Sequence, residues 1–174
     1  MTPAARSRFR RRSAGLLLYR RAALRLQVLL VHPGGPLWAR RDLGAWSIPK
    51  GEYADDEDPL AAARREFQEE LGSPPPVPGS AAELLDLGEI RQKSGKLVHA
   101  WALAGDLDAA EIASNTFAME WPPRSGQIKE FPEVDRAQWF EPDEARAKLN
   151  PAQVALVDRL QEALRDGRGA TGRS

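Results

Sequence analysis

The sequence predicts an α/β fold, on the order in which its apolar runs and amphipathic segments follow one another. Strand-like runs come first, one well-marked helix follows, further strand-like runs come next, and an amphipathic segment closes the chain. Short clusters of aliphatic residues are typical of strands, whereas apolar residues at about every third or fourth position are typical of helices. A single chain that contains both kinds of segment buries them as layers around one core.

Two strands and one helix are predicted in the first half of the chain. The runs "AGLLLYR" (14–20) and "LRLQVLLVH" (24–32) have strand length and composition, with Arg20 to Ala23 as the turn between them. The segment "PGGPLWARRDLGAW" (33–46) is predicted to be a loop. The helix has Asp58 as its N-cap, Pro59 at its first position and Gly72 as its terminator.

The second half repeats the alternation of strands and a helix. The proline cluster "SPPPVPGS" is expected to be a surface connector, and "LLDLGEIRQ" and "LVHAWALAGD" are expected to flank a hairpin turn at Lys93 to Lys96. The last strand is "RAQWFEP", and the closing helix is "NPAQVALVDRLQEAL", capped by Asn150.

Composition points to one ordinary globular domain. The 174 residues are 42% apolar and 29% charged, which is enough apolar material for one core. We expect residues 1–12 to form a basic, flexible arm, residues 13–165 to form a single domain, and residues 166–174 to be disordered. The apolar run from Ala14 to Tyr19 is too short for an export signal or a membrane span.

Charge and cysteine content exclude several functional classes. Lys and Arg together number 25 and Asp and Glu together number 25, so no net charge draws the protein toward nucleic acid or an anionic membrane. Cysteine is absent, which excludes disulfides, thiolate zinc sites and a cysteine nucleophile, and which fits a cytoplasmic protein. The chemistry must therefore use oxygen and nitrogen groups.

The first helix carries an unusual concentration of carboxylates beside its apolar stripe. At about 100° per residue, the predicted buried stripe consists of Leu60, Ala63, Phe67 and Leu71. Glu66, Glu69 and Glu70 share the adjoining arc, where like charges repel. Arg65 can neutralise one of them. A hard divalent cation would turn the remaining repulsion into coordination, whereas the alternative is an exposed, solvated acidic face.

The spacing of these residues resembles the Nudix box. Glu57 follows Gly51 after five intervening residues, Arg65 follows after seven more, and the run from Arg65 to Gly72 reads "REFQEELG". The similarity runs from Gly51 to Gly72 without an insertion. One departure is Ser73, where the family usually has an aliphatic residue.

The resemblance implies a Nudix-type α/β/α sandwich with a mixed β-sheet. It also implies a hydrolase that requires Mg²⁺ or Mn²⁺ and cleaves a pyrophosphate bond in a nucleoside diphosphate linked to another group. Cations held by carboxylates screen the charge that builds up when water attacks phosphorus, and they lower the pKa of bound water.

The resemblance assigns roles to individual residues. Glu66, Glu69 and Glu70 match the metal-binding glutamates of the family. Glu57 matches its upstream glutamate, which belongs to the metal site either by supporting the ligands or by binding the metal through water. Arg65 matches the arginine that orients the cluster, and the Gly51 carbonyl is a further candidate ligand. Family members take their general base either from the box or from a later loop. Our first candidate is Glu66, which lies in the box. The later candidates in "IKEFPEVDRAQWF" are Glu133 and, after it, Glu130.

Residues outside the box are candidates for substrate contacts. Lys50 stands in "WSIPKG", a form that resembles family members acting on dinucleoside polyphosphates or diphosphoinositol phosphates, and a lysine there can contact a polyphosphate as a point charge. Trp38 and Trp121 lie in loop-like contexts and can stack on a nucleobase. The tryptophans at positions 46, 101 and 139 are expected to pack in the core.

Alternatives of other classes remain open at the level of sequence. The hydrolase itself would act on a substrate such as a dinucleoside polyphosphate or a nucleoside triphosphate. One alternative is a module that keeps the fold and senses a nucleotide without cleaving it, and another is an enzyme acting on RNA 5′ ends. The expected partner is a small nucleotide or polyphosphate, without membrane or nucleic acid, and a homodimer is left open. An intact set of acidic residues favours the enzyme, because a binding module needs no general base.

Overall fold

The computed structural model describes residues 11–77, 79 and 84–170. The main sheet is formed by β1 (Arg12–Ala22), β2 (Arg25–Pro33), β3 (Lys50–Glu52), β4 (Leu84–Arg91), β5 (Leu97–Ala104) and β8 (Val134–Phe140). A separate two-stranded sheet is formed by β6 (Thr116–Glu120) and β7 (Ile128–Pro132). The helices are α1 (Pro59–Leu71), α2 (Pro142–Lys148) and α3 (Val154–Ala170), with short 3₁₀ turns η2 (Ala109–Glu111) and η3 (Pro151–Gln153).

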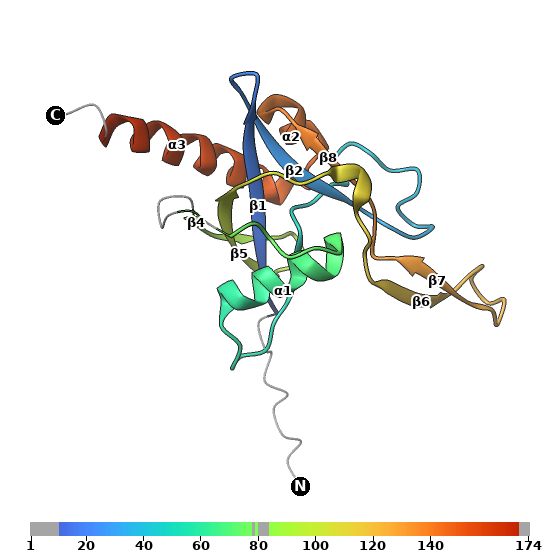
Figure 1. The fold of residues 1–174 in the computed structure, drawn as a ribbon. Helices are drawn as coiled ribbons and strands as arrows, with labels where there is room; N and C mark the ends of the chain where they lie inside the picture. Colours follow the sequence, from blue (N-terminus) through green and yellow to red (C-terminus); the bar gives the residue numbers. More distant parts are fainter. Residues whose placement is uncertain (1–10, 78, 80–83, 171–174) are drawn as a thin grey trace, which may run out of the picture.

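The main sheet is mixed and has β1 at its centre. The strands follow the order β4-β5-β1-β2-β8, and β3 pairs with the first residues of β1. β1 runs parallel to β5 and antiparallel to β2 and β3. Helix α1 covers one face of this sheet and α3 lies on the other, which gives the expected α/β/α sandwich (Figure 1).

Alternate residues of β1 supply both cores. Leu16 and Leu18 face α1 and pack with its Phe67, whereas Leu17 faces the side of α3 and belongs to the core that contains Leu160. All five side chains are almost fully buried. A strand buried on both faces reads as a continuous apolar run, which is how this segment reads in the sequence.

Helix α1 has the start and the stop predicted for it. The Asp58 side chain accepts from the Ala61 backbone N–H at 2.9 Å, and Pro59 is the first helical residue. Gly72 adopts a left-handed φ of 80° and donates its N–H to the Gln68 carbonyl. The buried face consists of Ala62, Ala63, Phe67 and Leu71, and Leu60 is only partly buried against the same core.

Several boundaries differ from the predictions. The turn between β1 and β2 consists of Ala23 and Leu24, both with positive φ, so it is shorter than the predicted turn from Arg20 to Ala23. A two-residue turn with this backbone continues the twist of the two strands. Helix α3 runs to Ala170, so residues 166–170, which were expected to be disordered, are helical.

Four elements were absent from the predictions. β3 is three residues long and α2 is seven, which is too short for a periodic pattern to show. β6 and β7 pair only with each other, and their side chains are mostly exposed, so neither strand has a buried face to reveal it. Most of the predicted basic arm (residues 1–10) lies outside the described residues, and β1 begins at Arg12. Among the described helices, none is long and apolar enough to cross a membrane.

Candidate active site

The first contact of the site joins β3 to α1. Gly51 pairs with Ala14 of β1, and this pairing brings its backbone against the carboxyl group of Glu66. A Cβ atom at position 51 would stand 2.0 Å from the Glu66 Cδ atom. The Glu66 side chain is only 12% exposed. Glycine at position 51 therefore leaves the space in which this carboxylate lies.

Arg65 holds three of the glutamates at once. Its Nε and Nη2 atoms donate to the two carboxylate oxygens of Glu57 at 3.0 and 3.2 Å. Its Nη1 atom donates to Glu66 at 2.8 Å and more weakly to Glu69 at 3.3 Å. The first of these contacts lowers the pKa of the Glu57 carboxyl below its usual value. The arginine thus orients the acidic cluster through charge-assisted hydrogen bonds.

Glu70 is the most deeply placed carboxylate of the cluster. It accepts a hydrogen bond from the Lys50 backbone N–H, while its Oε2 atom is buried and has no hydrogen-bond partner. Burial raises the pKa of Glu70 to about 8, and the charges of Glu66 and Glu133 add to the rise, against the opposing charge of Lys50. A buried oxygen without a partner is costly in the folded state, so this atom is available to a ligand.

The pKa values of ionisable groups around Glu70 are also shifted. Burial raises the pKa of Glu66, against the hydrogen bond from Arg65 that lowers it. Burial also raises the pKa of Glu133, and the charge of Glu69 adds to it. The pKa of Lys50 is lowered by burial, although the nearby Glu70 opposes that change. The cluster therefore collects more negative charge than Arg65 and Lys50 balance.

A pocket of about 430 Å³ opens beside Glu70 and Glu133. Its other walls are apolar and come from two segments, the loop after β2 and the β6–β7 hairpin. They consist of Pro33 at the end of β2, Gly34, Gly35, Pro36, Leu37 and Trp38 from the loop, and Phe117 and Met119 from the hairpin. A lining that combines carboxylates with aromatic side chains suits a ligand that has a charged or polar part and a flat, apolar part.

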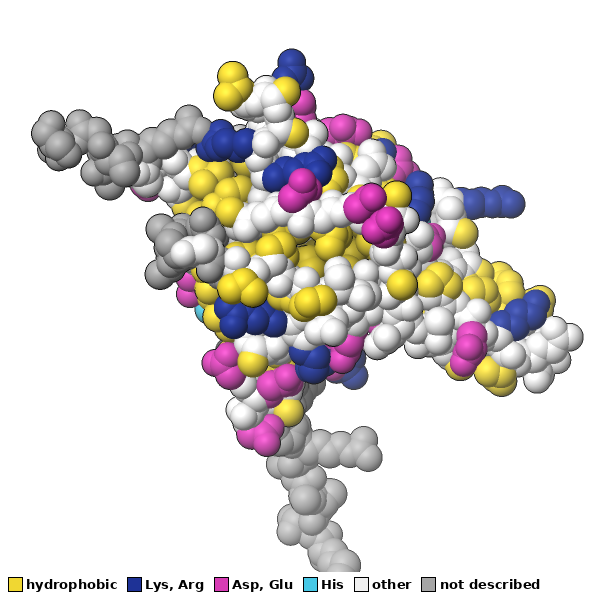
Figure 2. Space-filling model, in the orientation of Figure 1, with side chains coloured by type: hydrophobic (Ala, Val, Ile, Leu, Met, Phe, Trp, Pro, Cys, Tyr) yellow, Lys and Arg dark blue, Asp and Glu magenta, His cyan; other side chains and the backbone are white. Residues whose placement is uncertain are grey.

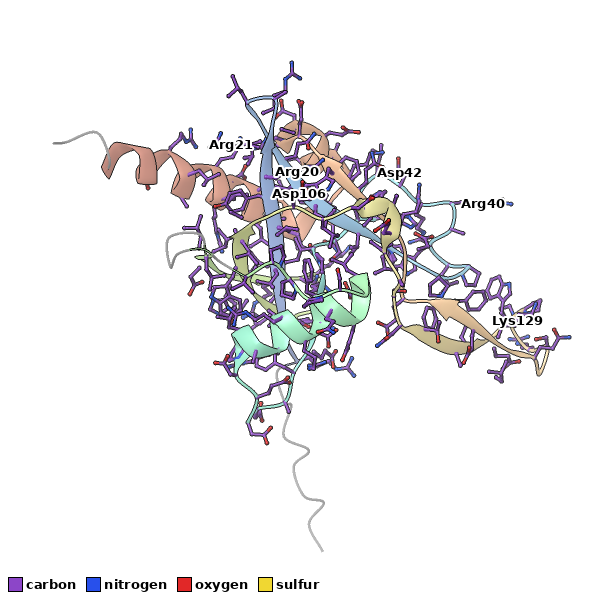
Figure 3. The ribbon with its side chains drawn as sticks, viewed as in Figure 1. Arg20, Arg21, Arg40, Asp42, Asp106 and Lys129 are labelled. Atoms are coloured by element: carbon purple, nitrogen blue, oxygen red, sulfur yellow. The ribbon has the colours of Figure 1, made fainter. Side chains whose placement is uncertain are left out.

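The loop rests directly on the hairpin. Gly35 has φ 92°, and a Cβ atom there would stand 2.9 Å from the ring of Phe117. The hairpin projects from the body of the protein (Figure 1), and Figure 2 shows hydrophobic side chains along it. Arg40 on the loop and Lys129 on the hairpin point away from the protein, which leaves both cations to solvent (Figure 3).

The structure brings most, but not all, of the predicted site residues together. Trp38 lines the pocket with Glu133 and is 37% exposed. Glu130 is an exposed residue of β7 that does not line it. Trp121 follows β6 at the far end of the hairpin, where its backbone N–H donates to the Gln127 carbonyl. It does not line the pocket either. Trp46 is buried, as expected. Sequence reasoning missed Phe117, because its strand shows no buried periodicity.

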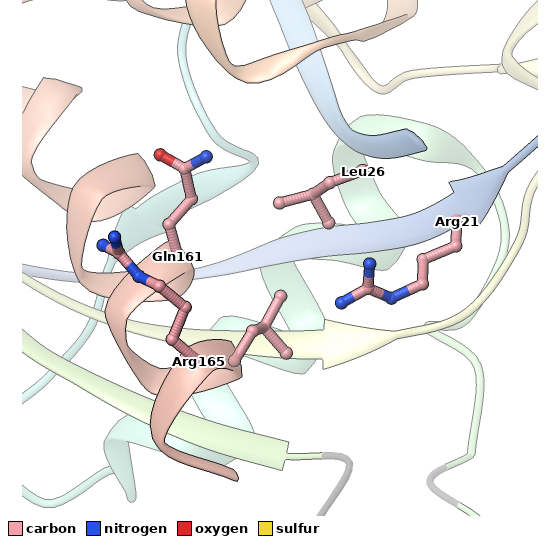
Figure 4. Close-up of a pocket in the computed structure, with 5 residues that line it drawn as sticks. Arg21, Leu26, Gln161 and Arg165 are labelled. Carbon is pink, nitrogen blue, oxygen red and sulfur yellow. The ribbon is translucent and has the colours of Figure 1, made fainter. Parts of the chain in front are cut away.

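A second cavity lies on the other side of the sheet. It has a volume of about 220 Å³ and is lined by Arg21 and Leu26 of the β1–β2 hairpin and by Gln161, Leu164 and Arg165 of α3 (Figure 4). Among the described residues that line it, none carries a carboxylate. It is therefore not the place where the acidic cluster can act.

The residues present fit a divalent cation chemically. Oxygen ligands of Glu66, Glu69 and Glu70 suit a hard cation, and the partnerless Glu70 oxygen and the raised pKa values show where positive charge is lacking. Within the described part of the chain, no three acidic or histidine side chains already converge as a ligand set. In this arrangement Glu66 and Glu69 both accept hydrogen bonds from Arg65.

Comparison with known proteins assigns the family. The family model described as NUDIX domain matches residues 9–160. The chain therefore belongs to the Nudix family, and its class is that of the Nudix pyrophosphohydrolases. No curated protein matches the chain in a direct search.

Solved structures share the fold at low sequence identity. The chain is similar to a C. elegans Ap4A hydrolase in a binary complex, with 21% identity, a TM-score of 0.59, and coverage of 90% of this chain and 98% of that one. It is also similar to the NUDIX domain of Shewanella oneidensis NrtR complexed with ADP ribose, with 18% identity, a TM-score of 0.57, and coverage of 88% and 87%. A third similar structure is RenU, a Nudix hydrolase from M. smegmatis, with 24% identity, a TM-score of 0.54, and coverage of 90% and 87%.

Proposed function

We propose that this protein is a divalent-metal-dependent hydrolase that cleaves a pyrophosphate bond in a nucleoside diphosphate linked to another group. The observation that carries the proposal is the partly buried cluster of Glu66, Glu69, Glu70 and Glu133 beside an aromatic pocket. An uncompensated acidic cluster is suited to cations, which when bound would attract phosphates, and the aromatic walls are suited to a nucleobase.

The glutamates of α1 are the proposed holders of Mg²⁺ or Mn²⁺. Glu66, Glu69 and Glu70 supply the carboxylates, and the Gly51 carbonyl is a further candidate ligand. A bound cation would screen the charge that develops on the phosphate oxygens and lower the pKa of a water molecule. Glu57 acts through Arg65, which its two oxygens hold in place.

The general base has two candidates, of which the geometry favours Glu133. Glu66 accepts a hydrogen bond from Arg65 through one of its oxygens, which occupies that oxygen and opposes the rise of its pKa caused by burial. Glu133 lines the pocket, and its raised pKa makes it a better proton acceptor than an ordinary surface carboxylate. We assign the base to Glu133, with Glu66 as the alternative.

The proposed substrate is a dinucleoside polyphosphate or a nucleoside triphosphate. Trp38 and Phe117 line the pocket as flat faces on which a base can stack. Lys50, next to Glu70, adds a positive charge for a polyphosphate chain. The Ap4A hydrolase and the ADP-ribose complex among the similar structures support a nucleotide ligand of this size.

A substrate panel tests the proposal. Dinucleoside polyphosphates, ADP-ribose, nucleoside triphosphates and an RNA with a 5′ triphosphate are incubated with and without Mg²⁺ or Mn²⁺, and the products are identified. We expect metal-dependent hydrolysis of at least one small nucleotide, and Glu69→Gln prepared in parallel controls for contaminating enzymes. Tight nucleotide binding without hydrolysis under every metal condition would show a sensing module instead.

A further inference from the structure

His32 joins the two protein segments that carry the pocket residues Trp38 and Glu133. It lies near the end of β2 and is fully buried. Its Nδ1 atom is 2.7 Å from Asp135 Oδ1, and its Nε2 atom is 2.6 Å from the Arg41 carbonyl oxygen. The ring also packs edge-on against Trp46, with the ring centroids 5.2 Å apart.

Both ring nitrogens have a polar partner. A backbone carbonyl can only accept, so the Nε2 atom must donate to Arg41. The Nδ1 atom and Asp135 Oδ1 form the second hydrogen bond. A buried imidazole with two satisfied hydrogen bonds is a rigid connection, because either broken bond leaves a buried polar group without a partner.

On one side the connection fixes the loop that carries Trp38. The Arg41 N–H donates to the Trp38 carbonyl at 2.9 Å, and the Trp38 N–H donates to the Gly35 carbonyl at 3.3 Å. The Arg41 guanidinium lies 5.3 Å from the centre of the Trp38 ring. Residues 37–43 are all exposed, so side-chain burial contributes little to holding this loop. His32 supplies a buried anchor at the point where the turn ends.

On the other side the connection reaches the segment that carries Glu133. Asp135 lies in β8, two residues after Glu133, and Val134 between them is buried. The Gly34 N–H donates to the Glu133 carbonyl at 2.9 Å, so the start of the loop is fixed to the same segment. The loop is thus held to the Glu133 segment at both ends, by a backbone bond at one end and by His32 at the other.

We propose that His32 is a positioning residue, which fixes Trp38 relative to Glu133 and so sets the affinity of the pocket for the nucleotide. This inference rests on the proposed function. His32 does not line the pocket and acts only through Arg41 and Asp135. Its loss should therefore weaken substrate binding more than it slows the chemical step.

The experiment compares His32→Gln with His99→Gln. The protein has two histidines, and His99 is the matched control. Its Nε2 atom lies 2.7 Å from Asp86, so it also contacts an aspartate. His99 is on β5 and Asp86 is on β4, and neither residue lines the pocket. Glutamine at position 32 can donate to one acceptor but not to both. With the best substrate, we expect KM to rise about tenfold in His32→Gln, the size expected from one buried hydrogen bond, with kcat within about threefold of the wild type. His99→Gln should change neither.

Hydrogen exchange tests the positioning without a substrate. Backbone amides of residues 37–43 should exchange about tenfold faster in His32→Gln than in the wild type, and those of α1 should not change. Asp135→Ala should reproduce both effects, and Asp135→Asn, which keeps an acceptor oxygen, should lie between it and the wild type. This series also replaces His32→Gln if that variant does not fold.

The outcomes separate this inference from the proposed function. If the wild-type protein cleaves no nucleotide, the proposed function is wrong. The hydrogen exchange of the backbone amides of residues 37–43 still tests whether His32 positions the loop. Unchanged exchange in both His32→Gln and Asp135→Ala, or a fall in kcat with an unchanged KM, would overturn the role of His32.

Discussion

The carboxyl group of Glu66 lies in the space that a side chain at position 51 would fill, since a Cβ atom on Gly51 would stand 2.0 Å from its Cδ atom. The group that must move in a Gly51→Ala variant is the far end of a flexible side chain. We expect the melting temperature to change little and turnover to fall about 10²-fold, because the displaced carboxylate belongs to the site. Gly167→Ala, where the added methyl meets open space, is the control. A large loss of stability with normal turnover would contradict this role of Gly51.

The charge on Glu70 makes the metal-free protein less stable as pH rises. Its pKa is raised to about 8 in the folded state, so between about pH 5 and pH 8 the folded protein binds more protons than the unfolded chain. Stability is therefore highest at the lower end of this window and decreases toward pH 8. Thermal denaturation with a chelator measures this slope, which should be shallower in Glu70→Gln. Equal slopes in the two proteins would show that Glu70 is not perturbed.

Divalent cations should reverse that loss of stability. Mg²⁺ or Mn²⁺ that binds only the folded protein raises its melting temperature, and the shift grows with concentration. We expect the shift in the wild type at pH 8 and its loss in Glu69→Gln and Glu70→Gln, which without metal should each be slightly more stable because repulsion is relieved. A flat response of the wild type up to tens of millimolar would count against the cation site.

Glu133 and Glu130 form a matched pair for testing the general base. Both lie in or directly after β7, but only Glu133 lines the pocket. Glu133→Gln should lower kcat about 10²-fold or more and remove the acidic limb of the pH–rate profile, since the base must be ionised to act. Glu130→Gln should stay within about threefold of the wild type. If Glu66→Gln removes the acidic limb and Glu133→Gln keeps it, Glu66 is the base.

Lys50 is tested by Lys50→Met, which keeps the length of the buried chain and the backbone N–H bonded to Glu70. If the charge contacts a polyphosphate chain, KM should rise about tenfold for substrates with three or more phosphates and less for diphosphate-linked ones. Lys96→Met is the control, because Lys96 pairs with Glu52 at 2.8 Å. An equal loss on both substrate classes would remove this role of Lys50.

The α1 half of the site follows closely from the sequence, because its determinants are local. Asp58, Pro59 and Gly72 set the ends of α1, and the helical period places Glu66, Glu69 and Glu70 beside the buried face. The contact of Arg65 with Glu66 and Glu69 spans one helical turn and follows from the same period.

The pocket could not be predicted in the same way, because it depends on long-range packing. Phe117 reaches Gly35 only through a hairpin that lies outside the main sheet and shows no buried periodicity. Glu133 lies more than sixty residues after Glu70 in the sequence. It comes close to Glu70 because the strand that follows it, β8, pairs with β2. Trp121 has the same loop-like sequence context as Trp38, and only the path of the hairpin separates them.

The central position of β1 also governs the order of events during folding. Its parallel partner is β5, which pairs Arg12 with Leu97, so the middle of the sheet cannot close until more than half of the chain has left the ribosome. Contacts this distant in sequence form slowly, and until then β1 exposes apolar side chains on two faces. We therefore expect a slower synthesis of the segment before β5 to lengthen this exposure and to favour aggregation of the emerging chain.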